Sequence, residues 1–161
     1  MPENIIIIFI HLMAAAVALG SLVYCLMFFL PALAKGPSAK NPVEQSADYK
    51  ALETLSPTVF VALLALIGSG LYFLLANYSD SKDYAEGYYN LFGVKMVLVA
   101  VAFFISIYQT FTLKNQISNL DINPENRNNV PAVLEKIKTM SRVSLGVISV
   151  AAFLGIWLAR F

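Results

Sequence analysis

Apolar residues in this 161-residue chain gather into four long segments separated by polar stretches. The charge-poor segments cover residues 5–34, 56–79, 87–113 and 143–159. A helix needs roughly 20 apolar residues to cross a hydrocarbon core of roughly 30 Å, and the first three segments exceed this length. The fourth is shorter, but residues 131–142 can lead into it as a helix. The pattern therefore predicts an all-α fold, a bundle of four transmembrane helices.

The predicted helices form a single membrane domain over residues 1–161 and cover approximately residues 3–34, 56–78, 88–114 and 131–160. Pro31 is expected to kink or end the first helix. Ser56 and Pro57 favour a helix start, because serine is a good N-cap and proline fits the first helical position. Residues 43–55 place apolar side chains at a four-residue spacing, which favours a short interfacial helix before that start.

Composition supports a membrane protein rather than a soluble domain. The chain is 58% hydrophobic and 13% charged, whereas soluble domains average about 45–50% apolar and about 25% charged residues. The net charge of +1 offers no patch for nucleic acid. The chain has no nucleophile–base pair, paired carboxylates or phosphate loop, so hydrolytic chemistry finds no support, and whether the protein is an enzyme stays open.

Basic residues are concentrated in the loops after the first and third predicted helices. The other side of the membrane would hold only Lys82 and Arg160. Lysine and arginine gather on the cytoplasmic side of membrane proteins. The bias therefore predicts that both termini face the outer, periplasmic side, and we expect a bacterial inner membrane. The first segment is too long for a signal-peptide core and should remain as an anchor.

Two ionisable residues interrupt the apolar segments. His11, the only histidine, lies about two turns inside the first helix, and Lys95 lies within the third. Both helices start on the predicted outer side, so both residues should lie in the outer half of the membrane. Ionisable groups there are costly and indicate functional sites. The alternatives are a packing hydrogen bond for His11 and snorkelling of Lys95 to the interface.

Four further residues are candidates for a cofactor site in the same outer half. Tyr72 could donate a hydrogen bond and Arg160 could pair with a carboxylate, although both residue types also serve as interfacial anchors. Gly68 and Gly70 could leave room for a flat cofactor, or could simply allow helices to pack closely.

A metal site needs several converging ligands, and the chain offers few. Cys25, the single cysteine, lies fourteen residues from His11, roughly 21 Å along a helix, so the two cannot share one metal. Met96 could approach His11 from the third helix and complete a sparse copper site. With one histidine per chain, the remaining haem arrangements are a five-coordinate haem, a His–Met haem, or a haem shared across a homodimer.

Four stretches carry a family resemblance: FIHLMAAAVALGSLVYCLMFFLPAL, LIGSGLYFLL, LFGVKMVLVAVAFFISIYQ and MSRVSLGVISVAAFLGIWLA. They are similar to the helices of CopD-like membrane proteins, and HemJ-type protoporphyrinogen oxidases share this layout. The resemblance implies a first-helix histidine and a third-helix lysine, which correspond to His11 and Lys95. It also implies a four-helix fold and a haem b or a metal held near His11.

Three functions follow from these observations. The first is a protein that binds haem b through His11, with Lys95 and Arg160 near the propionates, and serves electron transfer or porphyrin oxidation. The second is copper handling by His11 with Met96, or with Met13 or Met27 of a second copy. The third is a non-enzymatic subunit of a larger membrane complex. Each of them implies contact with the lipid bilayer and none with nucleic acid.

Overall fold

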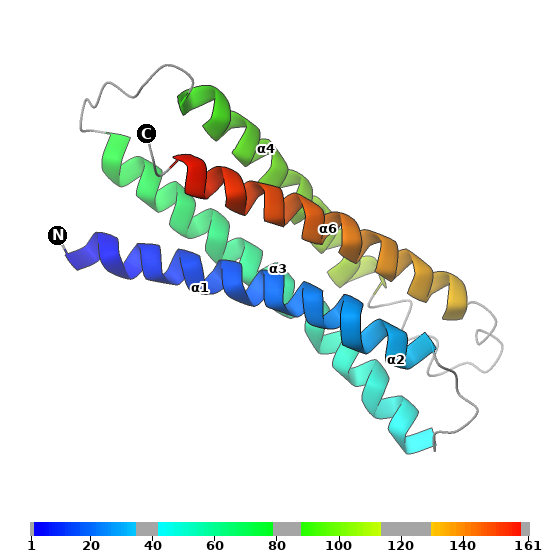
Figure 1. Cartoon of the computed structure of the whole chain (residues 1–161). Helices are drawn as coiled ribbons and strands as arrows, with labels where there is room; N and C mark the ends of the chain where they lie inside the picture. The colour runs from blue at the N-terminus through cyan, green and yellow to red at the C-terminus, as the bar shows by residue number, and fades with distance from the viewer. Residues whose placement is uncertain (1, 35–41, 79–87, 114–129, 159–161) are drawn as a thin grey trace.

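The computed structural model describes residues 2–34, 42–78, 88–113 and 130–158 (Figure 1). Within these ranges every element is helical. The elements are α1 (Pro2–Tyr24), the π-helical turn η1 (Cys25–Phe29), α2 (Leu30–Ala34), α3 (Pro42–Tyr78), α4 (Tyr88–Ile107), the π-helical segment η2 (Tyr108–Leu113) and α6 (Val130–Leu158). Because α1, η1 and α2 follow one another directly, as do α4 and η2, the chain forms four rods.

The four rods are long and apolar enough to cross a membrane. The candidate spans are Ile5–Ala32, Thr54–Ala76, Asn90–Thr112 and Ala132–Leu158. At most 28% of the most apolar window of any span is buried inside the bundle, and large apolar side chains such as Leu75 and Phe104 are exposed. Hydrocarbon suits such a surface, because helices satisfy their own backbone hydrogen bonds. The predicted all-α, four-helix membrane bundle is confirmed.

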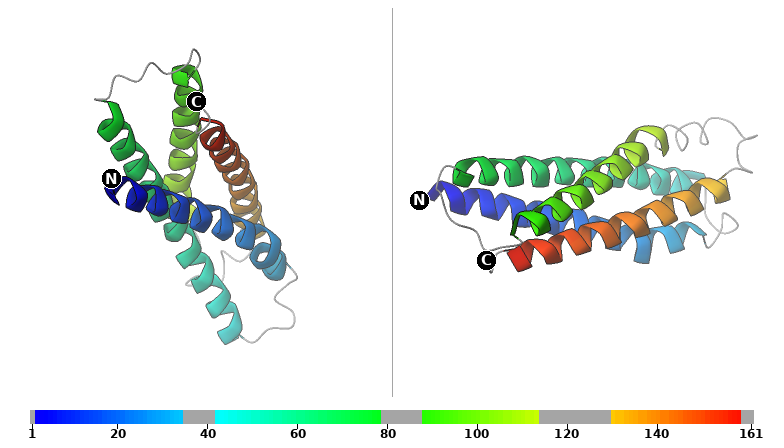
Figure 2. Two further views of the ribbon diagram at one scale, coloured as in Figure 1. Left: turned by 60° about the vertical axis from the view of Figure 1, so that its left-hand side comes forward. Right: turned by 90° about the horizontal axis from the view of Figure 1, so that it is seen from above.

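The rods alternate in direction and associate as two pairs (Figures 1 and 2). α1 packs most extensively on α3, and α4 packs most extensively on α6. The two pairs touch each other less, along α3–α4 and α1–α6. We call the end at which α1 begins and α6 finishes the N end, and the opposite end, which holds α2 and η2, the far end.

The α4–α6 pair keeps a regular antiparallel register. A methyl group at Gly155 would lie 3.1 Å from Lys95 Nζ, and Gln109 Nε2 donates to Ser141 Oγ at 3.2 Å. Between these two contacts, Ala102 and Ile148 belong to one buried cluster. Partners therefore recur every seven residues on each helix, which is about two helical turns and keeps one face of each helix against the other.

Nine of the buried apolar side chains form two clusters in the middle and far parts of the bundle. The middle cluster comprises Leu22, Val59, Leu63, Ala102 and Ile148. The far cluster comprises Cys25, Phe29, Leu30 and Ile137. Both clusters lie on the far side of the level of Ser69, whereas Leu158 is buried near the N end outside them.

The prediction that a helix starts at Ser56 is wrong, because α3 begins at Pro42 and contains Pro57. A proline inside a helix removes one backbone donor and normally kinks or breaks the helix. Here Thr58 Oγ1 donates to the Thr54 carbonyl at 2.9 Å, so a side chain adds a hydrogen bond beside Pro57. Ending the helix in hydrocarbon would instead leave several backbone groups unpaired. Residues 43–55, predicted as a separate helix, are the first part of α3.

Pro31 does not end its helix, which continues to Ala34. The π-helical turn η1 lies immediately before Pro31. Proline lacks the N–H that would bond the carbonyl four residues earlier, and its ring clashes with that carbonyl. The wider π turn accommodates the ring, so the proline changes the local helix type rather than ending the rod.

Candidate functional site

His11 is half-buried on α1, near the N end of the bundle, and contacts α3. Its Nδ1 lies 2.8 Å from Ser69 Oγ. Its Cε1 lies against Gly70, where an added methyl group would be 3.6 Å away, an ordinary van der Waals distance. The imidazole is therefore held between α1 and α3 by one hydrogen bond and one close backbone contact.

The hydrogen bonds of Ser69 determine which nitrogen of His11 carries the proton. Ser69 Oγ donates to the Ala65 carbonyl at 2.5 Å and also lies 3.2 Å from the Leu66 carbonyl. A hydroxyl has one proton to donate, and that proton is used on these carbonyls. With its proton on a carbonyl, Ser69 accepts from His11, and this network assigns the ring hydrogen to Nδ1. Nε2 of the neutral ring is left with a free lone pair, which can bind a metal or a proton.

Lys95 is half-buried on α4, one turn from the start of the apolar part of that helix. Its ammonium lies against Gly155 of α6, and a methyl group at position 155 would approach Nζ to 3.1 Å. The positive charge of Lys95 also acts on the His11 ring. The side chain thus occupies space that the glycine leaves, on the same side of the bundle interior as His11.

The remaining predicted site residues differ in their burial and in whether they contact His11. Gly70 contacts His11, whereas Gly68 is exposed and an added methyl group there would meet no atom. Tyr72 is 49% exposed on the surface of α3. Met96 is half-buried on α4. Arg160 lies outside the described residues.

Two residues of this site could not be singled out from the sequence as site residues. Ser69 fixes the His11 ring, and Gly155 makes room for Lys95. In the sequence, both are ordinary small residues within apolar segments. The signal that could have found them is the antiparallel pairing of the helices, because it places residues near the start of one rod opposite residues near the end of the next.

The protein itself supplies few metal ligands. Within the described segments, no three His, Cys, Asp or Glu side chains come together as a metal site. His11 is the only histidine of the chain, and Cys25 is buried in the far cluster. A metal at His11 therefore needs most of its ligands from another source. A porphyrin would supply four nitrogen ligands of its own.

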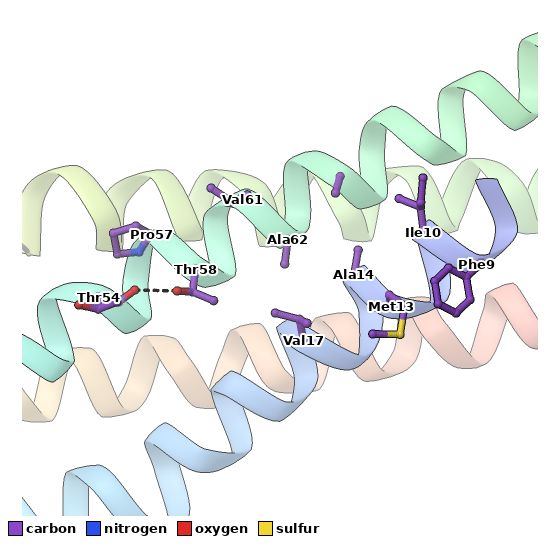
Figure 3. Close-up of a pocket in the computed structure, with 11 residues that line it drawn as sticks. Phe9, Ile10, Met13, Ala14, Val17, Thr54, Pro57, Thr58, Val61 and Ala62 are labelled. Atoms are coloured by element: carbon purple, nitrogen blue, oxygen red, sulfur yellow. Dashed lines mark hydrogen bonds between the residues drawn. The ribbon is translucent and has the colours of Figure 1, made fainter. Parts of the chain in front are cut away.

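An open groove of about 930 Å³ lies between α1 and α3, and His11 is not among the residues that line it (Figure 3). The two helices diverge there, with Met13 and Val17 on one wall and Thr54 and Val61 on the other. Its lining is apolar apart from two threonines, and Met13 is the one residue of the predicted sites that it contains. Lipid chains can fill such a surface, so we assign no chemistry to the groove.

Comparisons with protein-family models, with curated proteins and with solved structures found no match. The similarity to CopD-like and HemJ-type proteins therefore stays a prediction from the quoted residues. Any functional assignment has to be argued from the geometry of His11, Ser69 and Lys95.

Proposed function

We propose that this integral membrane protein binds haem b near the N end of the bundle, with His11 Nε2 as an axial ligand of the iron. The observation that carries the proposal is the His11–Ser69 hydrogen bond. Histidines that bind metals commonly donate their other ring N–H to a fixed acceptor, which sets the tautomer and the ring orientation. Ser69, itself tied to the Ala65 carbonyl, is such an acceptor.

Haem suits this ligand set better than a bare copper ion does. A copper site would need several nitrogen or sulfur ligands from the protein, and the described residues offer one imidazole without a cluster around it. An iron that already has four porphyrin nitrogens needs only one or two axial ligands. One histidine is then sufficient for a five-coordinate haem, and Met96 stays a candidate for a sixth ligand.

Lys95 would serve as the counter-charge for a haem propionate. An ammonium inside an apolar segment is costly unless it meets an anion or reaches water. Its position against Gly155 keeps it beside the interior surface that His11 shares. A propionate carboxylate would give Lys95 a partner and would fix the rotation of the ring about the iron–His11 axis.

Small residues at this level favour the fit of a flat ring. Ser69 and Gly70 face His11 from α3, and Gly155 faces Lys95 from α6. The two clusters of buried apolar side chains end before this level is reached. A planar macrocycle near His11 would therefore meet small residues on both α3 and α6.

Bound haem supplies one-electron chemistry, and the role proposed for the protein is electron transfer or porphyrin oxidation. His11 would hold the iron, Ser69 would hold the imidazole, and Lys95 would bind a carboxylate of the haem. The resemblance to CopD-like and HemJ-type proteins supports this division of roles. The distribution of basic residues supports an N end that faces the outer side of a bacterial inner membrane.

An absorption spectrum of the detergent-purified protein tests the proposal. The protein is produced with saturating haem supply and measured oxidised and dithionite-reduced, beside His11→Ala and the control Leu12→Ala. Leu12 neighbours His11 but is 62% exposed. We expect a Soret band in the wild type and in Leu12→Ala and its loss in His11→Ala. A featureless wild-type spectrum, or a band that His11→Ala leaves intact, would overturn the proposal, and metal analysis of the same sample would then test copper.

A further inference from the structure

A second group of polar side chains is buried in the α4–α6 half of the bundle, toward the far end. None of them carries a charge. They are Ser106, Gln109, Thr110, Ser141 and Ser144. Polar side chains buried between membrane helices are expected to be hydrogen-bonded, because hydrocarbon offers no substitute for water. Each of these side chains is therefore expected to have a hydrogen-bond partner.

Four of these residues form a polar ladder, which we define as Gln109 and Ser141 at one level and Ser106 and Ser144 at the next. Gln109 Nε2 donates to Ser141 Oγ at 3.2 Å. In an antiparallel pair, moving three residues back on α4 corresponds to moving three residues forward on α6. Ser106 therefore lies at the level of Ser144, about 4.5 Å nearer the N end.

Ser144 lacks the hydrogen bond that its burial demands. It is 1% exposed, and its Oγ has no partner in the described part of the chain. Serines and threonines within helices often donate to the carbonyl four residues earlier. Ser69 and Thr58 do so here, to Ala65 and Thr54. The Ser144 hydroxyl makes no such bond and remains available on the face that packs toward α4.

The ladder lies between two apolar layers. The next level toward the N end is the middle cluster, in which Leu63 and Ala102 are almost completely buried. In the other direction, Ile137 of the far cluster lies one turn beyond Ser141 on α6, and Tyr108 packs against that cluster. A polar group held at the level of Ser144 is therefore enclosed by apolar side chains on both sides.

We propose that an ordered water molecule binds Ser144 at the Ser106–Ser144 level. Water both donates and accepts, and buried waters typically bond several polar groups that would otherwise lack partners. The Ser144 hydroxyl is such a group, and Ser106 is buried at the same level. The result is a hydrated site enclosed between the middle and far clusters. This site does not depend on the proposed haem site, since it shares no residue with it.

The sign of a stability change tests the proposal. Ser144→Ala is compared in its midpoint of thermal unfolding with Ser149→Ala, an exposed serine on the same helix that corrects for helix propensity. If a water bonds Ser144, its loss should lower the midpoint of Ser144→Ala below that of Ser149→Ala. An equal or higher midpoint would overturn the proposal, because removing an unpaired buried hydroxyl relieves a penalty.

Discussion

The two ends of the bundle interior bury different kinds of side chain. Near the N end, the described interior holds an imidazole and an ammonium, each half-buried and each beside a small residue. The middle and far parts hold two apolar clusters and an uncharged polar ladder. The comparison teaches that stability comes mainly from the middle and far parts, whereas the N end keeps costly groups that packing alone does not require. Four substitutions test this division, and they are ordered by expected effect.

Leu63→Ala should produce the largest change, and it should affect stability. Leu63 is 1% exposed in the middle cluster, so truncation leaves a cavity and should cost about 2–5 kcal/mol of unfolding free energy. Reversible unfolding in mixed micelles, followed by circular dichroism, measures it. Leu64→Ala is the matched control, because Leu64 is 44% exposed. Equal losses in the two variants would mean that the middle cluster does not stabilise the bundle.

Ser69→Ala should come next, and it should affect the cofactor. Without its acceptor, the His11 ring loses its fixed tautomer and orientation, and replacing such a partner typically weakens metal binding by about 10–100-fold. Haem titration of the apoprotein followed at the Soret band measures the loss. Ser69→Thr keeps the hydroxyl and should restore most of the affinity. Unchanged affinity in Ser69→Ala would show that Ser69 does not position the ligand.

Gly155→Ala should have a smaller effect on the same titration. The new methyl group would lie 3.1 Å from Lys95 Nζ, so the ammonium must move. Crowding of this kind costs about 1 kcal/mol or more, which predicts haem binding weakened by about fivefold. Gly146→Ala on the same helix meets no atom and should leave binding unchanged. If the two variants bind haem equally well, Lys95 is not a propionate partner.

Gly68→Ala should have the smallest effect. An added methyl group there meets no atom, and alanine favours a helix over glycine by up to about 1 kcal/mol. We expect an unchanged Soret band and a slightly higher unfolding midpoint. Loss of the band would instead place the cofactor on the exposed face of α3, which holds Gly68, and would contradict the site proposed at His11.

The spans were predicted well from the sequence, because a charge-poor apolar segment of this length is typical of a transmembrane helix. The prediction failed at Pro57, where local preferences for a helix start were overridden by the need to keep α3 continuous. The inward face of each helix was harder to predict. A membrane helix is apolar on all sides, because it faces lipid on one side and other helices on the other. Its sequence therefore lacks the alternation of apolar and polar positions that would identify the inward face.

The same reasoning explains which site residues could be found. His11 and Lys95 stood out because each is an ionisable residue in an apolar segment. Ser69, Gly155 and Ser144 are ordinary small residues of membrane helices, and their roles depend on which residue faces them. That pairing is a property of the assembled bundle, so no feature of a single helix indicates it.

The seven-residue register of α4 and α6 has a mechanical consequence. The Lys95–Gly155 contact and the Gln109–Ser141 hydrogen bond lie about 21 Å apart along the same two helices. Sliding one helix by a single turn would break both at once, so we expect this pair to move as a stiff unit. Relative motion of the helices would then occur as sliding along the smaller α3–α4 and α1–α6 interfaces. A cross-link across one of these two interfaces should prevent that motion, whereas a cross-link within the α4–α6 pair should not.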